Sequence, residues 1–294
     1  MNDVFENFIS ALELKQQTEN SFSGPCLDLG SPRVFGGHVL GQSLKAAGLT
    51  VVDERICNSY HGYFLRPGDG TKAITYEVER IRDGRSFSTR RVVAHQGAKP
   101  ILSCIVSFHI PEASEQHQQP IPDVPSPEQL ESNTIVFRNY PDSPLKTARL
   151  HVENIIPIEL RFVDADKLLN PEKQEARQYI WFKAAGEFEG PLLQHQSIIA
   201  YASDFNLAGT CGLPHNLSGY SGNWQFSSLD HSIWFHHSSN INEWHLYVMD
   251  SPVLSSSRGL NRGSIYHNNR LVASVAQESL IRWIGGGERP KISS

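Results

Sequence analysis

The sequence has 294 residues, of which 39% are hydrophobic and 19% are charged. It is therefore long enough to form one large or two ordinary domains, and its composition excludes a globally disordered chain. The formal net charge of −5 at pH 7 excludes the bulk basic surface that nucleic-acid-binding proteins carry.

No stretch reaches the roughly 20 apolar residues that a membrane-spanning helix needs. The first residues are acidic and lack the basic start and apolar run of a secretory signal. The cysteines form no CxxC pair, and we expect reduced thiols at Cys26, Cys57, Cys104 and Cys211. These features predict a cytoplasmic protein. A peroxisomal location stays open for a eukaryotic source, although the C-terminal KISS does not closely match the SKL-type address.

The first half of the chain begins with a helix candidate over residues 38–49, in which Val39, Leu40, Leu44 and Ala47 form an apolar stripe. A strand opens at His61, and a hairpin is favoured at Asp83-Gly84 because this pair suits a primed turn. A later strand alternates, with one face formed by Leu102, Cys104, Val106 and Phe108.

Residues 111–135 are rich in Pro, Gln, Ser and Glu and have no apolar periodicity, which is typical of a linker. We therefore predict an N-terminal domain over residues 1–112, a linker over 113–148, a C-terminal domain over 149–285 and a flexible tail over 286–294.

The second half repeats the order of elements. A helix is expected over residues 194–206, a strand opens at His231, and a further strand has one face formed by Leu271, Ala273, Val275 and Gln277. The segment from His61 matches the segment from His231 at an offset of 170, and later and earlier matches fall at 171 and 154. One helix followed by antiparallel strands in each half predicts an α+β fold made by duplication, although chance similarity is the alternative.

Three polar residues of the second half are candidates for chemistry. Gln277 lies on an apolar strand face, Asp204 lies near the end of an apolar helix, and Ser228 lies where a strand begins. A buried acid at a helix C-terminus tends toward a raised pKa, which suits a general base. Each residue also has an ordinary explanation: a core amide bonded to the backbone, a solvated acid and a turn residue. Ser228 is not in a G-x-S-x-G elbow, which argues against a classical serine hydrolase.

The glycine-rich run over residues 34–42 leads into the first helix, and its backbone amides are suited to an oxyanion or a phosphate; a tight turn is the alternative. The run lacks the Lys of a P-loop and the G-x-G-x-x-G order of a dinucleotide-binding fold. Neighbouring histidines such as His236 and His237 point to opposite faces of a strand, so no metal and no cofactor are expected.

Several blocks resemble the acyl-CoA thioesterase II family (TesB type). They are VFGGH from Val34, YHGYFLRPGD from Tyr60, RDGRSF from Arg82, YASD from Tyr201, LDHSIWFH from Leu229 and SRG from Ser257. The resemblance covers residues 5–283 except the linker. It implies two fused hotdog domains, each a long helix on an antiparallel sheet, and hydrolysis of fatty acyl-CoA to free fatty acid and CoA.

The resemblance also implies a catalytic Asp, Thr and Gln that hold the attacking water. These positions fall on Asp204, Ser228 and Gln277, with Ser in place of the more familiar Thr. The loss of the β-branch frees the rotamer, so we expect a changed rate and the same reaction. At the repeat offsets Asp204 falls on Thr50 and Gln277 on Val106, so one active site per chain is predicted.

Substrate-binding residues are expected at Gly36, Gly37, His38, His61 and Arg258. Candidates for the CoA phosphates are Arg66, Arg85, Arg90, Arg91 and Arg258, with a solvated basic face as the alternative for each. A homodimer or homotetramer is implied by resemblance alone. Two other functions stay open at this stage. One is a hotdog enoyl-CoA hydratase, for which Asp230 and His231 make a poor catalytic pair because strand neighbours diverge. The other is a non-catalytic acyl-CoA-binding protein.

Overall fold

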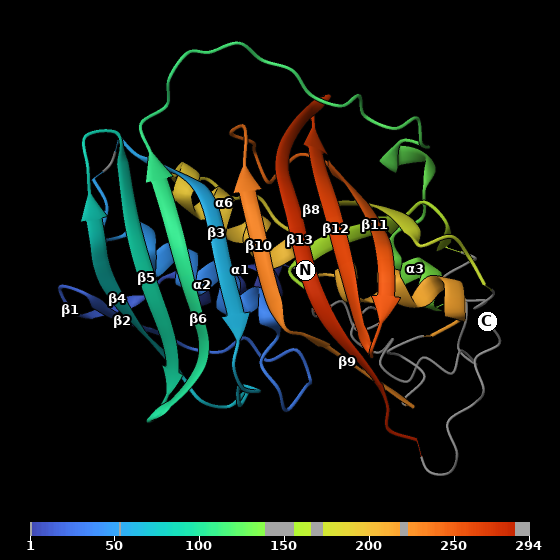
Figure 1. Ribbon diagram of the computed structural model, residues 1–294. Helices are drawn as coiled ribbons and strands as arrows, with labels where there is room; N and C mark the ends of the chain where they lie inside the picture. The colour runs from blue at the N-terminus through green and yellow to red at the C-terminus, as the bar shows by residue number, and fades with distance from the viewer. Residues whose placement is uncertain (1, 53, 139–155, 166–172, 218–222, 286–294) are drawn as a thin grey trace.

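The computed structural model describes residues 2–52, 54–138, 156–165, 173–217 and 223–285 (Figure 1). The predicted linker and the start of the predicted C-terminal domain lie partly outside these residues, and the predicted tail lies wholly outside them. The first half contains α1 (Asn2–Leu12), β1 (Lys15–Thr18), β2 (Ser21–Gly24), α2 (Gly36–Gly48), β3 (Ile56–Phe64), β4 (Ile74–Asp83), β5 (Phe87–Gln96) and β6 (Lys99–His109).

The second half repeats this helix-and-strand plan. It contains β7 (Ile158–Phe162), β8 (Arg177–Ala184), α6 (Leu192–Ala202), the 3-10 helix η3 (Leu207–His215), β9 (Trp224–Ser228), β10 (Asp230–Phe235), β11 (His245–Ser255), β12 (Arg258–His267) and β13 (Arg270–Trp283). Between the halves lie a 3-10 turn, η1 (Pro127–Gln129), and α3 (Asn133–Arg138).

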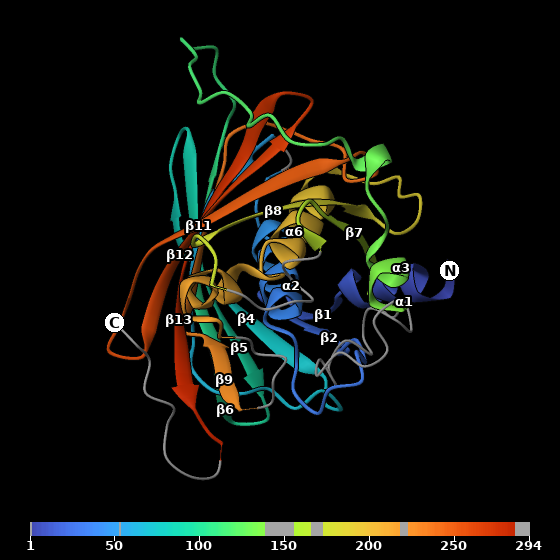
Figure 2. The ribbon, with the colours of Figure 1, turned by 90° about the vertical axis from the view of Figure 1, so that its right-hand side faces the viewer.

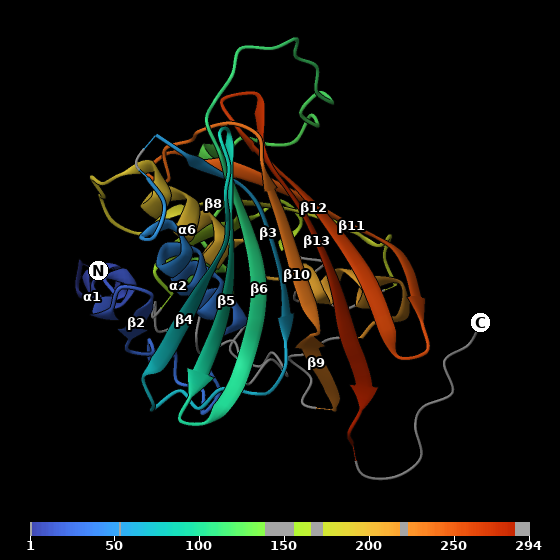
Figure 3. The ribbon, with the colours of Figure 1, turned by 60° about the vertical axis from the view of Figure 1, so that its left-hand side comes forward.

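The strands form one continuous antiparallel sheet in the order β1-β2-β4-β5-β6-β3-β10-β13-β12-β11-β8-β7, with β9 paired to β13. The two halves meet where β3 pairs with β10. The sheet curls around α2 and α6, which lie on its concave side (Figure 2), and Figure 3 shows α1 on that side as well. The fold is therefore the expected α+β double hotdog, and no helix among the described residues is long and apolar enough to span a membrane.

The two long helices pack closely because α2 carries a glycine at their contact. A Cβ on Gly41 would lie 2.8 Å from the carbonyl oxygen of Ser197 on α6. The apolar stripe of α2 is buried as predicted, with Val39, Leu40 and Leu44 between 0 and 4% exposed. Burial of such side chains contributes roughly 1.5–3 kcal/mol each, which makes the helix pair the centre of the core.

Strand register corrects one detail of the repeat. Arg91 pairs with Ile105, and Arg262 pairs with Ala276, so both partners are displaced by 171 residues. This offset aligns the buried Tyr60 with the buried His231 and the exposed His61 with Ser232. The offset of 170 that aligned His61 with His231 is therefore wrong by one residue. A shift of one residue in a strand moves a side chain to the other face, so these two histidines have different environments.

The second predicted helix also ends earlier than expected. Helix α6 stops at Ala202, Ser203 follows as its C-cap, and Asn206 has a left-handed backbone with φ of 59°. Asp204 therefore lies in the turn after the helix. Sequence periodicity extended the helix because Phe205 continues the apolar stripe, whereas the chain turns there into η3.

Candidate active site

Asp204 is held by groups from both halves of the protein. Its side chain is buried, and its Oδ2 accepts a 2.9 Å hydrogen bond from the backbone N–H of Gly37 at the start of α2. Its Oδ1 accepts a 3.2 Å hydrogen bond from the Ser228 hydroxyl, at the end of β9. Burial raises the pKa of Asp204, although these two donors and the nearby His231 oppose the rise. A carboxylate of this kind is suited to accept a proton from water.

Asp204 and Ser228 open into a cavity of about 590 Å³. Both halves supply its wall, because the loop before α2 and the end of β3 face the turn after α6 and strand β9. The wall is mostly apolar and includes Leu29, Val34, Phe35, Val39, Phe64, Ile101, Ile156, Phe205 and Phe226. An apolar cavity in which a few polar groups gather at one end suits a ligand that has a long apolar part and one reacting group.

Gln277 lies beside this pair but does not line the cavity, and it is completely buried. Its Oε1 lies 2.5 Å from Nδ1 of His231, and its Nε2 donates a 3.1 Å hydrogen bond to the Ser279 hydroxyl. In the described residues these contacts use one of the two N–H groups of the amide. The structure thus brings Asp204 and Ser228 into direct contact, whereas the side-chain contacts of Gln277 are with His231 and Ser279.

The five residues expected to bind substrate separate into two groups. Gly36 lines the cavity, and Gly37 contacts the Asp204 carboxylate through its backbone. The other three do not line the cavity. His38 is buried with its Nε2 3.0 Å from the carbonyl of Pro25, His61 contacts Ser232 on the convex face, and Arg258 pairs with Glu278 at 2.8 Å.

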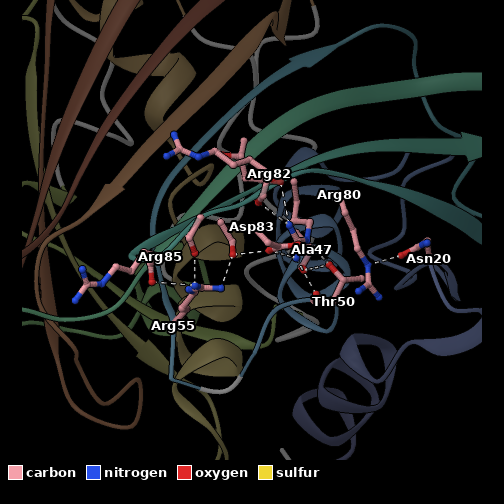
Figure 4. Close-up of polar contacts among 12 residues, drawn as sticks. Asn20, Ala47, Thr50, Arg55, Arg80, Arg82, Asp83 and Arg85 are labelled. Atoms are coloured by element: carbon pink, nitrogen blue, oxygen red, sulfur yellow. Dashed lines mark hydrogen bonds and ion pairs between the residues drawn. The ribbon is translucent and has the colours of Figure 1, made fainter.

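The arginines considered for phosphate binding also have different environments. Only Arg66 lines the cavity, together with Arg33, which the sequence did not single out. Arg90 is 1% exposed and donates to Thr50 and Asp83, in the polar cluster of the first half shown in Figure 4. Thr50 is the residue that falls on Asp204 in the repeat. In the first half, a buried guanidinium therefore donates to the residue that falls on Asp204.

His231 is the functional candidate that sequence reasoning dismissed. It was considered only as a partner of Asp230, and the structure separates the two: Asp230 accepts from the backbone N–H of Glu278, whereas the His231 ring contacts Gln277 and Ser203. A signal was present, because the LDHSIWFH block places this histidine on the buried face of a strand. Among the described residues, no cluster of His, Cys, Asp and Glu side chains has the grouping of a metal site.

Comparison with known proteins gives a consistent result. A family model described as "Acyl-CoA thioesterase" matches residues 157–280, and one described as "Acyl-CoA thioesterase N-terminal domain" matches residues 26–109. The chain is 35% identical to acyl-CoA thioesterase 2 of Haemophilus influenzae over 96% of this chain and 99% of that protein. It is 36% identical to human acyl-coenzyme A thioesterase 8 over 93% of this chain and 88% of that one.

A solved structure agrees with these matches. The chain superposes on the acyl-CoA thioesterase II TesB2 of Mycobacterium marinum with a TM-score of 0.78 and 33% sequence identity. The superposition covers 96% of this chain and 100% of the other, so it includes both halves.

Proposed function

Since the chain belongs to the acyl-CoA thioesterase II family and is an acyl-CoA hydrolase, we propose that it hydrolyses fatty acyl-CoA with a water activated by Asp204. The observation that carries this proposal is the contact between Asp204 and Ser228 at the wall of an apolar cavity. No other carboxylate lines that cavity among the described residues.

The proposed reaction begins with a water that contacts both residues. Asp204 accepts a proton from this water as the water oxygen forms a bond to the thioester carbonyl carbon. Collapse of the tetrahedral intermediate breaks the C–S bond, and CoA leaves as a thiolate that takes up the proton accepted by Asp204, which restores the carboxylate. The Ser228 hydroxyl orients the water from the other side. Gln277 is assigned to the same water from the family resemblance, although its buried amide contacts His231 and Ser279 and does not line the cavity.

The oxyanion needs a donor near the same place. Gly36 lines the cavity and is the first residue of α2, so its backbone N–H has no partner within the helix. The helix dipole also favours negative charge at this end. We assign the oxyanion to this N–H group, while the next one, on Gly37, is used by Asp204.

The acyl chain and the CoA phosphates require different surroundings. The apolar wall suits the acyl chain, and the exposed Arg66 and Arg33 at the cavity suit the phosphates. Replacing Arg66 with Ala is expected to raise KM for acyl-CoA but not for acyl-pantetheine, which lacks the nucleotide phosphates. An equal rise for both substrates would refute this assignment.

Release of CoA thiol over a series of acyl lengths tests the proposed function. Each added methylene that enters the cavity is worth about 0.8 kcal/mol, so kcat/KM is expected to rise up to about fourfold per methylene until the cavity is filled. Absence of thiol release at every length would refute the proposal. Hydration of enoyl-CoA without thiol release would identify a hydratase, and binding without turnover would identify an acyl-CoA-binding protein.

Association of the chain with further copies is a second part of the proposal. Tyr63, Ile105 and Trp234 are 64, 48 and 39% exposed on neighbouring strands of the central sheet. Large side chains of this kind are enriched at the centres of protein interfaces. A homo-oligomer through this face predicts a mass of at least two chains in light scattering and dissociation on replacing Trp234 with Asp. A monomeric wild-type protein would contradict it.

A further inference from the structure

The ring of His231 connects two parts of the candidate site. It lies on β10 directly across from Gln277 on β13, since the neighbouring pair is Ser232 and Ala276. One ring nitrogen, Nδ1, is 2.5 Å from Gln277 Oε1, and the other, Nε2, is 2.9 Å from the Ser203 hydroxyl. Ser203 immediately precedes Asp204. The ring therefore spans the distance from the Gln277 amide to the turn that carries the catalytic acid.

The direction of each hydrogen bond follows from the chemistry of the groups. His231 is 0% exposed, and burial lowers the pKa of its ring, so the neutral form with one N–H prevails at neutral pH. Because Gln277 Oε1 can only accept, the Nδ1–H of His231 donates to it. Nε2 then carries no hydrogen and accepts from the Ser203 hydroxyl, whose single hydrogen is shared between this nitrogen and the Ala200 carbonyl, each 2.9 Å from Ser203 Oγ. This arrangement turns the amide N–H groups of Gln277 away from the ring. One of them donates to the Ser279 hydroxyl, and no described residue accepts the other.

The first half provides an internal comparison. At the offset of 171 residues, His231 and Gln277 correspond to Tyr60 and Val106, which also face each other across two strands. That pair has no hydrogen bond of this kind, and the hydroxyl of Tyr60 contacts Ser43 instead. The His–Gln pair therefore occurs in the half that carries Asp204, and an aromatic–aliphatic pair occurs in the half that carries Thr50 in its place.

We propose that His231 is a positioning residue for thioester hydrolysis, which holds the Gln277 amide in one orientation relative to the Asp204 turn. His231 does not line the cavity and takes no proton from the reacting water. It acts through Gln277. This inference rests on the proposed function, because it needs Gln277 to contribute to hydrolysis.

Two substitutions separate the two contacts of the ring. In His231→Asn the amide nitrogen occupies the place of Nδ1 and still donates to Gln277. In His231→Gln the amide nitrogen occupies the place of Nε2, so the Ser203 side is kept and the Gln277 side is lost. We expect kcat within about threefold of wild type for His231→Asn and a loss of about tenfold or more for His231→Gln, with KM changed less than about twofold in both. Equal losses in both variants would refute the proposal.

A double-mutant cycle with Gln277→Ala tests whether His231 acts through Gln277. In the Gln277→Ala background, His231→Gln is expected to lower kcat by less than about twofold further. If His231→Gln lowers kcat by the same factor in the Gln277→Ala background as in the wild type, the proposal is refuted. If His231→Gln does not fold, Ser203→Ala replaces it in the cycle, because it frees the ring from the other side, and the same coupling to Gln277 is expected.

Two further variants distinguish the possible failures. His245→Gln replaces another completely buried histidine, stacked on Phe182 away from the cavity, and is expected to change stability but not kcat. Asp204→Asn tests the proposed function itself. Turnover in Asp204→Asn would refute activation of the water by Asp204, whereas an inactive Asp204→Asn with an additive His231–Gln277 cycle would refute only the positioning role.

Discussion

The backbone N–H of Gly37 donates a 2.9 Å hydrogen bond to the carboxylate of Asp204, 167 positions away in the other half of the chain. The first half has Thr50 where the second has Asp204, yet it supplies the helix start that receives this carboxylate and half of the cavity wall. Asp204 therefore has this hydrogen bond only when the two halves pack together. A favourable interaction with a helix N-terminus is worth roughly 0.3–1 kcal/mol, which offsets part of the cost of burying Asp204.

Replacing Gly36 with Ala is expected to lower kcat by about a hundredfold without unfolding the protein. The added Cβ would lie 2.6 Å from Asp204 Oδ2 and 3.0 Å from Phe64, so the carboxylate has to move away from the water position. Gly209→Ala is the matched control, because its Cβ meets no atom within 4 Å. Steady-state kinetics and thermal unfolding of both variants check this prediction. Wild-type kcat in Gly36→Ala would show that this carboxylate geometry is not required.

The raised pKa of Asp204 predicts the pH dependence of both activity and stability. Activity requires the carboxylate, so kcat/KM is expected to increase with pH through a pKa above the usual aspartate range. The wild-type protein is destabilised by the buried charge above that pKa. Asp204→Asn is therefore expected to unfold at higher temperature at pH 7, by roughly 0.5–2 kcal/mol in free energy, and the gain should shrink as pH falls through the pKa. The side-chain amide of Asn can form hydrogen bonds with both the Gly37 N–H and the Ser228 hydroxyl. A gain that persists at low pH would contradict this account.

Ser228 is expected to contribute through its hydroxyl alone. Ser228→Thr keeps the hydroxyl and restricts its rotamer, so kcat should stay within about fivefold of wild type. Ser228→Ala removes the donor to Asp204 and the water contact, and kcat should fall by about tenfold or more. Mass spectrometry during turnover should detect no acyl group on the protein. An acylated Ser228 would replace the water mechanism with a covalent one.

The polar cluster of the first half is expected to matter for stability and not for hydrolysis. Arg90 Nη2 lies 2.7 Å from Asp83 Oδ1, with the arginine buried and the aspartate half exposed. Asp83→Asn leaves a buried guanidinium without its counter-charge and should lower the free energy of unfolding by roughly 1–3 kcal/mol. Glu79→Gln, which removes the exposed ion pair with Arg91, should change it by less than about 0.5 kcal/mol.

The hydrogen bonds from Ser88 and Arg90 hold the pKa of Asp83 below its usual value. Its stabilising contribution is therefore present above the unfolded-state pKa and is lost as pH falls through the lowered folded-state pKa. The difference between Asp83→Asn and wild type should shrink in acid. Equal stability of the two proteins at pH 7 would contradict the importance of this ion pair.

Sequence patterns were sufficient for the features that depend on periodicity and on specific blocks. The buried faces of α2 and β6 follow from the spacing of Val39 and Leu40 and from the alternation of Leu102 and Cys104. The contact between Asp204 and Ser228 agrees with the pairing expected from the family resemblance.

Other features depend on pairing between distant segments, which no local pattern contains. The contact of Gly37 with Asp204 depends on how the two helices dock, and that of His231 with Gln277 depends on strand register. An error of one residue in the repeat offset was enough to align the buried His231 with the exposed His61. Because side chains alternate between faces, the pairing of β3 with β6 and of β10 with β13 is needed to resolve it.

Turnover of Asp204→Asn with a fatty acyl-CoA is the most direct test of the central claim, that a water activated by this carboxylate cleaves the thioester. The measurement is the rate of CoA thiol release by the folded variant, compared with the wild type at saturating substrate. We expect a loss of at least about a hundredfold in kcat with little change in KM. Hydrolysis near the wild-type rate would contradict the claim.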